Sequence, residues 1–435
     1  MSWYVAAVLI LVVAVILQFG LLAYAMYALL AVLIVSRYLA TQWVTQLRAE
    51  RECSRATAEE GDQVAVVVTV TNTGWLPIVW VLIEDLLPRK ALVFRPPYLE
   101  VDGRRAVLTM LRAGGTQFLR YQMRCHRRGY YQIGPLILET GDVFGLHRRY
   151  RVAAPPVFLT VYPRTVPLQG YQIASRRPIG EVRMTHRLYE DPTRQVGVRQ
   201  YQPGDSLGRV HWPATARTGI LHSKIYEPST VAGATIVLDL HQDANPAHNE
   251  PYRSELAVTA AVSLANAVYE MGQQVGLVSN GRDAADRVRT EGWAYDWRSR
   301  DAARLSAEMQ DESDRLTPVV VPTRRGEEQF LCIRDALARV ELTDGLTLPQ
   351  LLDECAGNMP RDATVLVIVQ DVSDVVAISI DNLRRQGFSV SVVLNIYEPW
   401  EFSIAAGPLI AAGIDVHHLR DEASIVAVAE RFLLR

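Results

Sequence analysis

The sequence predicts three structural parts in order: an N-terminal transmembrane helical hairpin, an antiparallel β-sandwich and a C-terminal doubly wound α/β domain. Three observations lead to this fold class. Residues 3–35 are almost continuously apolar, residues 56–163 alternate apolar and polar side chains, and residues 231–435 alternate apolar strands with helical segments. A chain of 435 residues is long enough for several domains.

The apolar N-terminus is interrupted by little more than Gln18 and Gly20. One helical crossing of a bilayer takes roughly 20 residues, so the run is too long for one upright span and slightly short for two. A tight turn at Gln18-Phe19-Gly20 would make residues 1–36 a helical hairpin. A cleaved signal peptide would need a basic start and a shorter apolar run. A single tilted span is the alternative, and it would place the N-terminus outside.

The charges that flank this run predict its orientation. Met1 and Ser2 carry no charged side chain, whereas four arginines follow the apolar segment: Arg37, Arg48, Arg51 and Arg55. Because positive flanks stay on the cytoplasmic side, we expect the large C-terminal part in the cytoplasm, attached to the inner (cell) membrane. Residues 37–55 are expected to leave the bilayer as a short juxtamembrane helix.

A period of two marks residues 56–163 as the sandwich, because its short segments alternate and are separated by Gly and Pro. The expected strands lie within residues 62–85, 105–111, 116–126, 130–140 and 157–164. Two basic clusters, Arg124–Arg128 and His147–Arg151, would either contact anionic lipid or keep a solvated sheet edge from pairing, and the second reading is preferred. Residues 164–195 have no clear period and are expected to be a connector.

In the last part, continuous apolar strands are expected at residues 234–241, 275–280, 364–371, 388–395 and 414–419, with a long helix at 252–272. Strands of this kind that alternate with helices form a mostly parallel sheet covered on both faces. Ligands bind such sheets at the carboxyl ends of the strands. Asp239 and Asp243 follow the first strand, Asp371 ends a later one, and Thr347 precedes a helix. These oxygens could hold Mg²⁺; the alternative is that they cap helices and loops.

This pattern resembles the von Willebrand factor type A domain, whose metal-ion-dependent adhesion site begins with DxSxS. The resemblance implies that residues 231–435 are such a domain and that Asp239, Thr347 and Asp371 are metal ligands. His241 and Asp243 stand where the two serines would be, so the site is degenerate. Mg²⁺ is the one cofactor that this resemblance suggests.

Residues 196–230 hold the densest polar motif, RQYQPGDSLGRVHWPATARTG. It is similar to the signature of a widespread prokaryotic family, the domain-of-unknown-function-58 family, which reads R-x-Y-x-x-G-D and then H/D-W-x-x-[ST]-A-R. The residues of interest are Arg199, Tyr201, Gly204, Asp205, Arg209, His211, Trp212 and Arg217. Gly208 and Pro213 depart from the family's usual basic residues. The apolar N-terminus, RRGYYQIGP and GDVFGLHRR extend the resemblance along the chain.

The signature motif offers no nucleophile with a base, no carboxylate pair and no phosphate-binding loop. We therefore expect no catalytic residue in it. It is expected to pack on the C-terminal domain with Trp212 as an anchor and Asp205 paired with Arg217, or to form a partner surface.

The resemblance implies association with a MoxR-type AAA+ ATPase. The expected function is a membrane-anchored, cytoplasm-facing adaptor in complex assembly or maturation, with the lipid bilayer and other envelope proteins as further partners. The charge balance, 45 basic against 47 acidic residues, gives no indication of a nucleic-acid partner. Two alternatives stay open: a metal-assisted hydrolase of cell-envelope metabolism that uses Asp239, Asp371 and His241, and a purely structural membrane scaffold.

Overall fold

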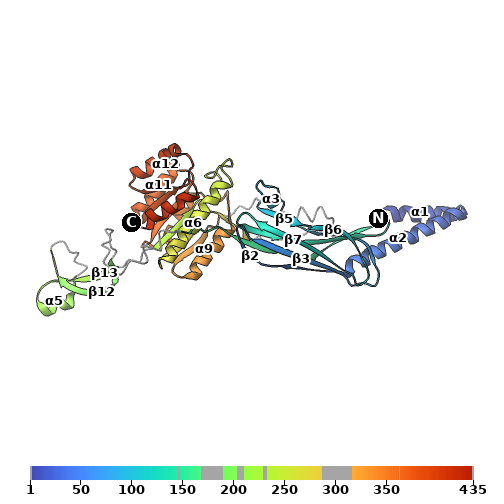
Figure 1. Cartoon of the computed structure of the whole chain (residues 1–435), viewed down its shortest axis with the longest axis horizontal. Coiled ribbons are helices and arrows are strands. Elements are labelled where there is room, and N and C mark those ends of the chain that lie inside the picture. The colour runs from blue at the N-terminus through green and yellow to red at the C-terminus, as the bar shows by residue number, and fades with distance from the viewer. Residues whose placement is uncertain are drawn as a thin grey trace. The chain divides into compact units, whose positions relative to one another are not determined.

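The computed structural model describes residues 2–145, 147–167, 190–202, 210–228, 233–286, 316–361 and 363–433. The chain forms two compact units, one built on Met1–Arg164 and the other mainly on Thr165–Arg282 and Glu341–Arg435 (Figure 1). Each unit is described by itself.

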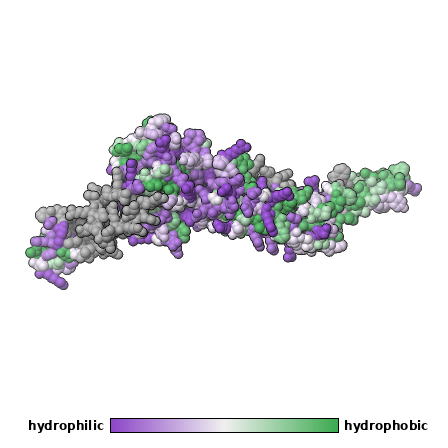
Figure 2. All heavy atoms as spheres, in the orientation of Figure 1, coloured by the Kyte–Doolittle hydropathy of each residue, from purple (hydrophilic) through white to green (hydrophobic). Residues whose placement is uncertain are grey.

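Two apolar helices open the first unit, α1 (Ser2–Ile16) and α2 (Gly20–Gln46). A three-residue turn joins them at the predicted position, with Gln18 in the left-handed region at φ 56°. The helices lie side by side: Ala7 and Ala14 are buried, and the Tyr4 hydroxyl donates to the Leu33 carbonyl at 3.0 Å. Most other side chains point outward and form the apolar surface in Figure 2. By length and composition α2 could cross a membrane.

The expected juxtamembrane helix over residues 37–55 is wrong beyond Gln46. Helix α2 continues unbroken to Gln46, and β1 (Leu47–Cys53) follows as a strand antiparallel to β3 (Gln63–Asn72). The reason is a local change of period, because in β1 exposed side chains alternate with buried or half-buried ones. Leu47 is fully buried in the sandwich core, so this domain begins before residue 56.

The rest of the first unit is the sandwich. Two four-stranded antiparallel sheets, ordered β1-β3-β7-β5 and β10-β9-β4-β6, share one core, and a small sheet, β2-β11-β8, completes it. The remaining elements are β2 (Thr57–Glu59), β4 (Ile78–Asp85), α3 (Arg89–Val93), β5 (Leu99–Gly103), β6 (Ala106–Leu111), β7 (Thr116–Cys125), β8 (Gly129–Ile133), β9 (Leu136–Gly141), β10 (Arg148–Ala154) and β11 (Val157–Tyr162). The predicted alternation is confirmed in β3 and β7, where every second side chain is buried.

A buried charged group ties the sandwich together. Arg51 on β1 forms an ion pair with Asp85 at the end of β4, and both side chains are almost fully buried. The Arg51 Nε–Asp85 Oδ2 distance is 3.0 Å, and the Tyr121 hydroxyl donates to Asp85 Oδ2 at 2.7 Å. Arg51 Nη1 also donates to the carbonyls of Ile133 and Pro155. Arg51 therefore belongs to the core rather than to the positive flank of the membrane segment.

The second unit contains the expected α/β sheet, ordered β17-β15-β14-β19-β20-β21. Five strands are parallel, and β17 joins one edge antiparallel. The strands are β14 (Gly233–Leu238), β15 (Gln274–Ser279), β17 (Val319–Arg324), β19 (Thr364–Val369), β20 (Ser389–Leu394) and β21 (Asp415–His418). The helices are α6 (Tyr252–Glu270), α9 (Glu327–Arg339), α10 (Leu348–Cys355), α11 (Asp374–Arg385), α12 (Pro399–Ala411) and α13 (Glu422–Leu433).

Helices cover both faces of this sheet. Helices α10, α11 and α12 share one core with the strand residues of one face, while α6 packs on β14, β15 and β19 and also contacts α13. The sheet is therefore α/β, largely parallel and doubly wound, as predicted.

The signature motif lies between β12 (Glu190–Gln200) and β13 (His222–Pro228), which pair with each other, and contains the short helix α5 (Trp212–Thr218). The predicted connector over 164–195 is thus shorter than expected, because β12 already begins at Glu190. The rest of that connector lies mostly outside the described residues.

Candidate functional site

Three predicted segments meet at the carboxyl edge of the parallel sheet. Asp239 directly follows β14, Asp371 follows the neighbouring strand β19, and residues 343–347 lie beside them. The Thr343 N–H donates to the Leu240 carbonyl at 3.1 Å, which fixes the loop that carries Thr347. The strand order reverses between β14 and β19, because β15 extends the sheet on one side and β20 on the other. This reversal is the usual ligand position in such folds.

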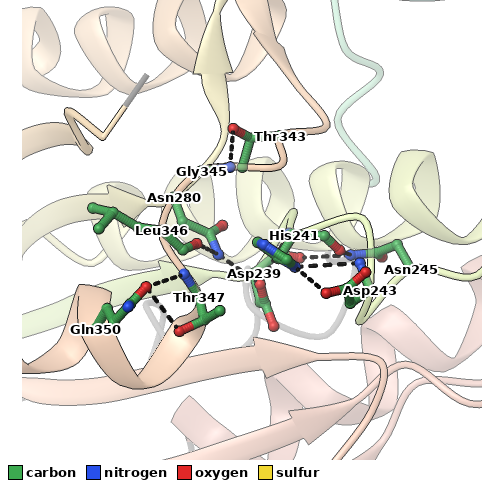
Figure 3. Close-up of polar contacts among 10 residues, drawn as sticks. All are labelled: Asp239, His241, Asp243, Asn245, Asn280, Thr343, Gly345, Leu346, Thr347 and Gln350. Atoms are coloured by element: carbon green, nitrogen blue, oxygen red, sulfur yellow. Dashed lines mark hydrogen bonds and ion pairs between the residues drawn. The ribbon is translucent and has the colours of Figure 1, made fainter. Parts of the chain in front are cut away.

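Asp239 is the centre of a hydrogen-bond network (Figure 3). Its Oδ1 accepts from Asn280 Nδ2 at 2.7 Å and from the His241 N–H at 3.1 Å. Asn280 also donates to the Leu346 carbonyl at 3.0 Å and accepts from the Leu240 N–H at 2.7 Å. Burial raises the pKa of Asp239 above its ordinary value, and the charge of Asp371 raises it further, while the two hydrogen bonds lower it. Through its bonds to His241 and Asn280, the Asp239 carboxylate links the loops after β14 and β15 to the loop that contains Leu346.

Among the described residues, none of the other predicted ligands hydrogen-bonds to Asp239. The Thr347 N–H and Oγ1 both donate to Gln350 Oε1, at 3.0 and 3.1 Å, so Thr347 caps α10 (Figure 3). Asp371 is exposed, and the Asp243 side chain is 93% exposed. Among the residues that the structure describes, no three His, Cys, Asp or Glu side chains lie close enough together to hold a metal ion. Mg²⁺ usually binds through one or two carboxylates and keeps several waters, so Asp239, Thr347 and Asp371 stay a prediction as its ligands.

The loop after Asp239 is closed by its own polar groups. His241 Nδ1 accepts from the Asp243 N–H at 3.2 Å, and Asn245 Nδ2 donates to the His241 carbonyl at 2.8 Å. This is the capping alternative that the sequence left open. Asn280 was missed by the sequence reasoning, although its place after the apolar strand VGLVS was a usable signal.

A cluster of exposed aromatic rings lies at the same edge, and the sequence reasoning missed it as well. It comprises Tyr252 at the start of α6, Tyr397 after β20 and Trp400 at the start of α12; we call it the aromatic edge. Arg253 is buried, and its guanidinium carbon lies 5.7 Å from the Tyr252 ring centroid and 5.3 Å from that of Tyr397.

The guanidinium of Arg253 is held by two hydrogen bonds. Its Nη1 donates to Asn395 Oδ1 at 3.1 Å and to the Arg420 carbonyl at 2.9 Å. A guanidinium fixed in this way supports both tyrosine rings, and that of Arg420 also lies over Tyr397, 5.0 Å from its ring centroid, while both tyrosines stay about half exposed. The aromatic edge is therefore a supported aromatic surface on a folded domain.

In the signature motif, His211 has a structural position. It is the N-cap of α5: its Nδ1 accepts from the Ala214 N–H at 3.1 Å, and its own N–H donates to the His222 carbonyl at 2.8 Å. The Thr215 hydroxyl accepts from the His222 N–H at 3.1 Å, which holds the same helix face against β13. Asp is also an effective N-cap, so an aspartate at this position would keep the cap.

Trp212 does not anchor the motif, contrary to the prediction, since 67% of the residue is exposed. Every residue of α5, Arg217 included, is at least partly exposed. Arg199 and Tyr201 lie at the end of β12 and just after it, and the Tyr201 N–H donates to the Leu221 carbonyl at 2.8 Å. Gly204, Asp205 and Arg209 lie outside the described residues, and with them the predicted Asp205–Arg217 pair.

The capping role predicts that His211→Ala destabilises α5 by about 1 kcal/mol, whereas His211→Asp keeps its stability. The measurement is hydrogen exchange of the α5 amides in the full-length protein, with Arg217→Ala, an exposed residue of the same helix, as the control. Equal exchange in the Ala and Asp variants would show that the cap contributes nothing.

The sequence of this region matches a described family. Residues 197–292 match the model of "Protein of unknown function DUF58", and the match covers the signature motif, β14, α6 and β15. The match supports membership of the DUF58 family.

A relative in Bacillus subtilis (strain 168), "Uncharacterized protein YeaD", agrees with this DUF58 assignment. It is 26% identical over 261 residues, which cover 59% of this chain and 62% of that protein. The alignment thus spans less than two thirds of the relative's length.

Solved structures with some likeness cover only parts of this chain. The CARDB domain of PF1109 from Pyrococcus furiosus is 12% identical, with 27% of this chain and 94% of that one covered and a TM-score of 0.17. Proximal thread matrix protein 1 from the mussel byssus is 13% identical, with 46% and 44% covered and a TM-score of 0.27. At these TM-scores neither likeness supports a conclusion about fold or function.

Proposed function

We propose that this DUF58 protein is a membrane-anchored protein-binding module whose two folded units face the cytoplasm. In this proposal α1 and α2 form a hairpin in the inner membrane, and the von Willebrand type A-like α/β domain binds a partner through its carboxyl edge. The partner implied by the family resemblance is a MoxR-type AAA+ ATPase that assembles or matures other envelope proteins.

The observation that carries the proposal is the aromatic edge. Tyr, Trp and Arg dominate the binding energy of protein interfaces because they bury much apolar area for little conformational entropy. Tyr397 lies over Arg253, which in turn is fixed by Asn395, so the ring is ordered before any partner arrives. Trp400 is 61% exposed and adds a large apolar surface three residues further along.

The same edge gives less support to a metal-bridged contact. Asp239 is occupied by Asn280 and His241, and Thr347 is occupied by Gln350. An ion completed by a partner carboxylate would have to share Asp239 Oδ1 with the two hydrogen bonds that it already accepts. The proposed contact therefore uses aromatic packing and needs no metal ion.

The test is the affinity between the full-length protein in detergent and a purified MoxR-type AAA+ ATPase. Tyr397→Ala and Trp400→Ala are each expected to weaken binding at least about tenfold, which corresponds to about 1.4 kcal/mol. The matched control is Ile378→Ala on α11, because Ile378 is also 61% exposed. Wild-type affinity in both aromatic variants would remove the aromatic edge from the proposal.

Metal dependence is tested with variants rather than with EDTA alone, since EDTA also removes the Mg²⁺ that accompanies the nucleotide of an ATPase. Unchanged affinity in Asp371→Asn agrees with a metal-free contact. A loss as large as that in Trp400→Ala would favour a metal bridge instead. Absence of any binding to the ATPase would refute the implied partner.

A further inference from the structure

The loop between β9 and β10 presents two apolar side chains to the outside, Val143 and Phe144, which are 60% and 67% exposed. Its base is rigid. Asp142 is buried, its Oδ1 accepts from the His147 N–H at 2.6 Å, and its Oδ2 accepts from the Phe144 N–H at 3.3 Å. Trp80 Nε1 donates to the Asp142 carbonyl at 3.3 Å. Val143 and Phe144 are therefore exposed on a loop that is held in place by hydrogen bonds.

This loop lies where the two apolar helices meet the sandwich. His147, at its end, has Nε2 at 2.9 Å from the Tyr4 hydroxyl of α1 and Nδ1 at 3.2 Å from the Ser36 hydroxyl of α2. These contacts place the start of α1, the middle of α2 and the loop at one level of the first unit.

Basic residues occupy the same level. Arg37 follows Ser36 on α2, and Arg148 and Arg149 follow His147 at the start of β10; all three are exposed. An aromatic side chain beside arginines is the pattern that proteins show at the headgroup region of a bilayer. Strand β10 is also a sheet edge, so its charges serve the edge-protecting role as well.

One face of α2 beyond this level is covered by the sandwich. Ser36, Ala40 and Trp43 are buried, and this stretch packs on β9 and β10. Residues 20–35 therefore form the free leg of α2, about 24 Å long, and α1 is about 22 Å long at 1.5 Å per residue. Both are shorter than the roughly 30 Å hydrocarbon core. The bilayer covers the full apolar length of both helices only if its surface lies at the level of His147.

We propose that the β9–β10 loop is a lipid-binding surface: Val143 and Phe144 insert into the headgroup region of the membrane that holds α1 and α2, with Arg37, Arg148 and Arg149 on lipid phosphates. This inference rests on the membrane attachment proposed above. It fixes the membrane boundary on the folded unit, with the N-terminus on the same side as the sandwich.

The test places an environment-sensitive fluorescent amino acid at one position at a time in the full-length protein. The protein is reconstituted in vesicles of phosphatidylethanolamine and phosphatidylglycerol that carry nitroxide quenchers at the headgroup or at the end of the acyl chain. Position 144 reports on the loop, and position 9, exposed in the middle of α1, reports on the hairpin. The control is position 94, an exposed phenylalanine stacked on Tyr98.

Position 94 lies near the far end of the sandwich. The strand that follows it begins at Leu99, which pairs with Cys125 at one end of β7, whereas Thr116 is at the other end. We expect the headgroup quencher to quench position 144 more than the acyl-chain quencher does, the reverse order at position 9, and no quenching at position 94. Quenching at 9 without quenching at 144 would overturn the lipid-binding loop and leave the membrane anchor standing. No quenching at 9 or 144 would overturn both.

Discussion

Replacing Arg51 with methionine is expected to lower the free energy of unfolding of the sandwich by about 3–5 kcal/mol, because it leaves the buried Asp85 carboxylate without its cation. Methionine keeps most of the apolar length, so the loss reports on charge rather than on volume. The carbonyls of Ile133 and Pro155 also lose a donor. The measurement is hydrogen exchange of the β1 and β3 amides of the full-length protein in detergent, over a urea series.

The pH dependence of this variant has a definite sign. Burial raises the pKa of Asp85, and the Arg51 guanidinium opposes that effect. Without Arg51, the folded-state pKa rises further above the unfolded value of about 3.9. The folded state then binds the proton more tightly than the unfolded state does. Arg51→Met is therefore least stable above its folded pKa and regains stability as the pH falls toward about 4.

Two further variants separate the buried charge from other effects. Arg55→Met removes an exposed arginine that lies 3.4 Å from Asp62 and is expected to change stability by less than about 0.5 kcal/mol. Adding Asp85→Leu to Arg51→Met removes the unpaired charge, so it should recover part of the loss. A double variant less stable than Arg51→Met would show that the carboxylate matters for more than its pairing.

Asp239→Ala is expected to destabilise the α/β domain by about 3 kcal/mol, since the buried donors of Asn280 and His241 lose their acceptor. Asp239→Asn keeps an acceptor oxygen and loses only the charge. It should therefore stay within about 1 kcal/mol of the wild type at neutral pH. The measurement is hydrogen exchange of the β14 amides.

The comparison of wild type with Asp239→Asn also has a predicted pH dependence. The folded pKa of Asp239 is raised by burial, so its contribution to stability is present below the unfolded pKa of about 3.9 and is lost as the pH rises through the folded pKa. The asparagine cannot ionise. The variant should therefore gain on the wild type between acid and neutral pH.

Addition of Mg²⁺ tests whether this edge can bind a metal ion. Stabilisation of the wild type by Mg²⁺ that disappears in both Asp239→Asn and Asp371→Asn would mean that the edge rearranges into a metal site. Asp371→Asn alone serves as the control for charge, because Asp371 is exposed and acts on Asp239 only through its field.

Much of the fold could be predicted because its signals are local. The apolar run, the alternation in β3 and β7, and the helix α6 each appear in a short window of sequence. The meeting of Asp239, Asp371 and the Thr347 loop was also predictable, since the carboxyl ends of parallel strands lie at one edge. Their hydrogen-bond partners were not, because Asn280 reaches Asp239, and Gln350 reaches Thr347, only once the loops are packed.

The sequence alone determined the order of the parts, the position of the turn at Gln18 and the edge of the sheet where polar side chains gather. Only the tertiary structure decided that Arg51 belongs to the core with Asp85, that Trp212 is exposed, and that Tyr252 and Tyr397 share one arginine. The physical reason is the range of the interactions. Periodicity records how a residue relates to its own helix or strand, whereas pairing between residues far apart depends on strand order and packing, which no short window contains.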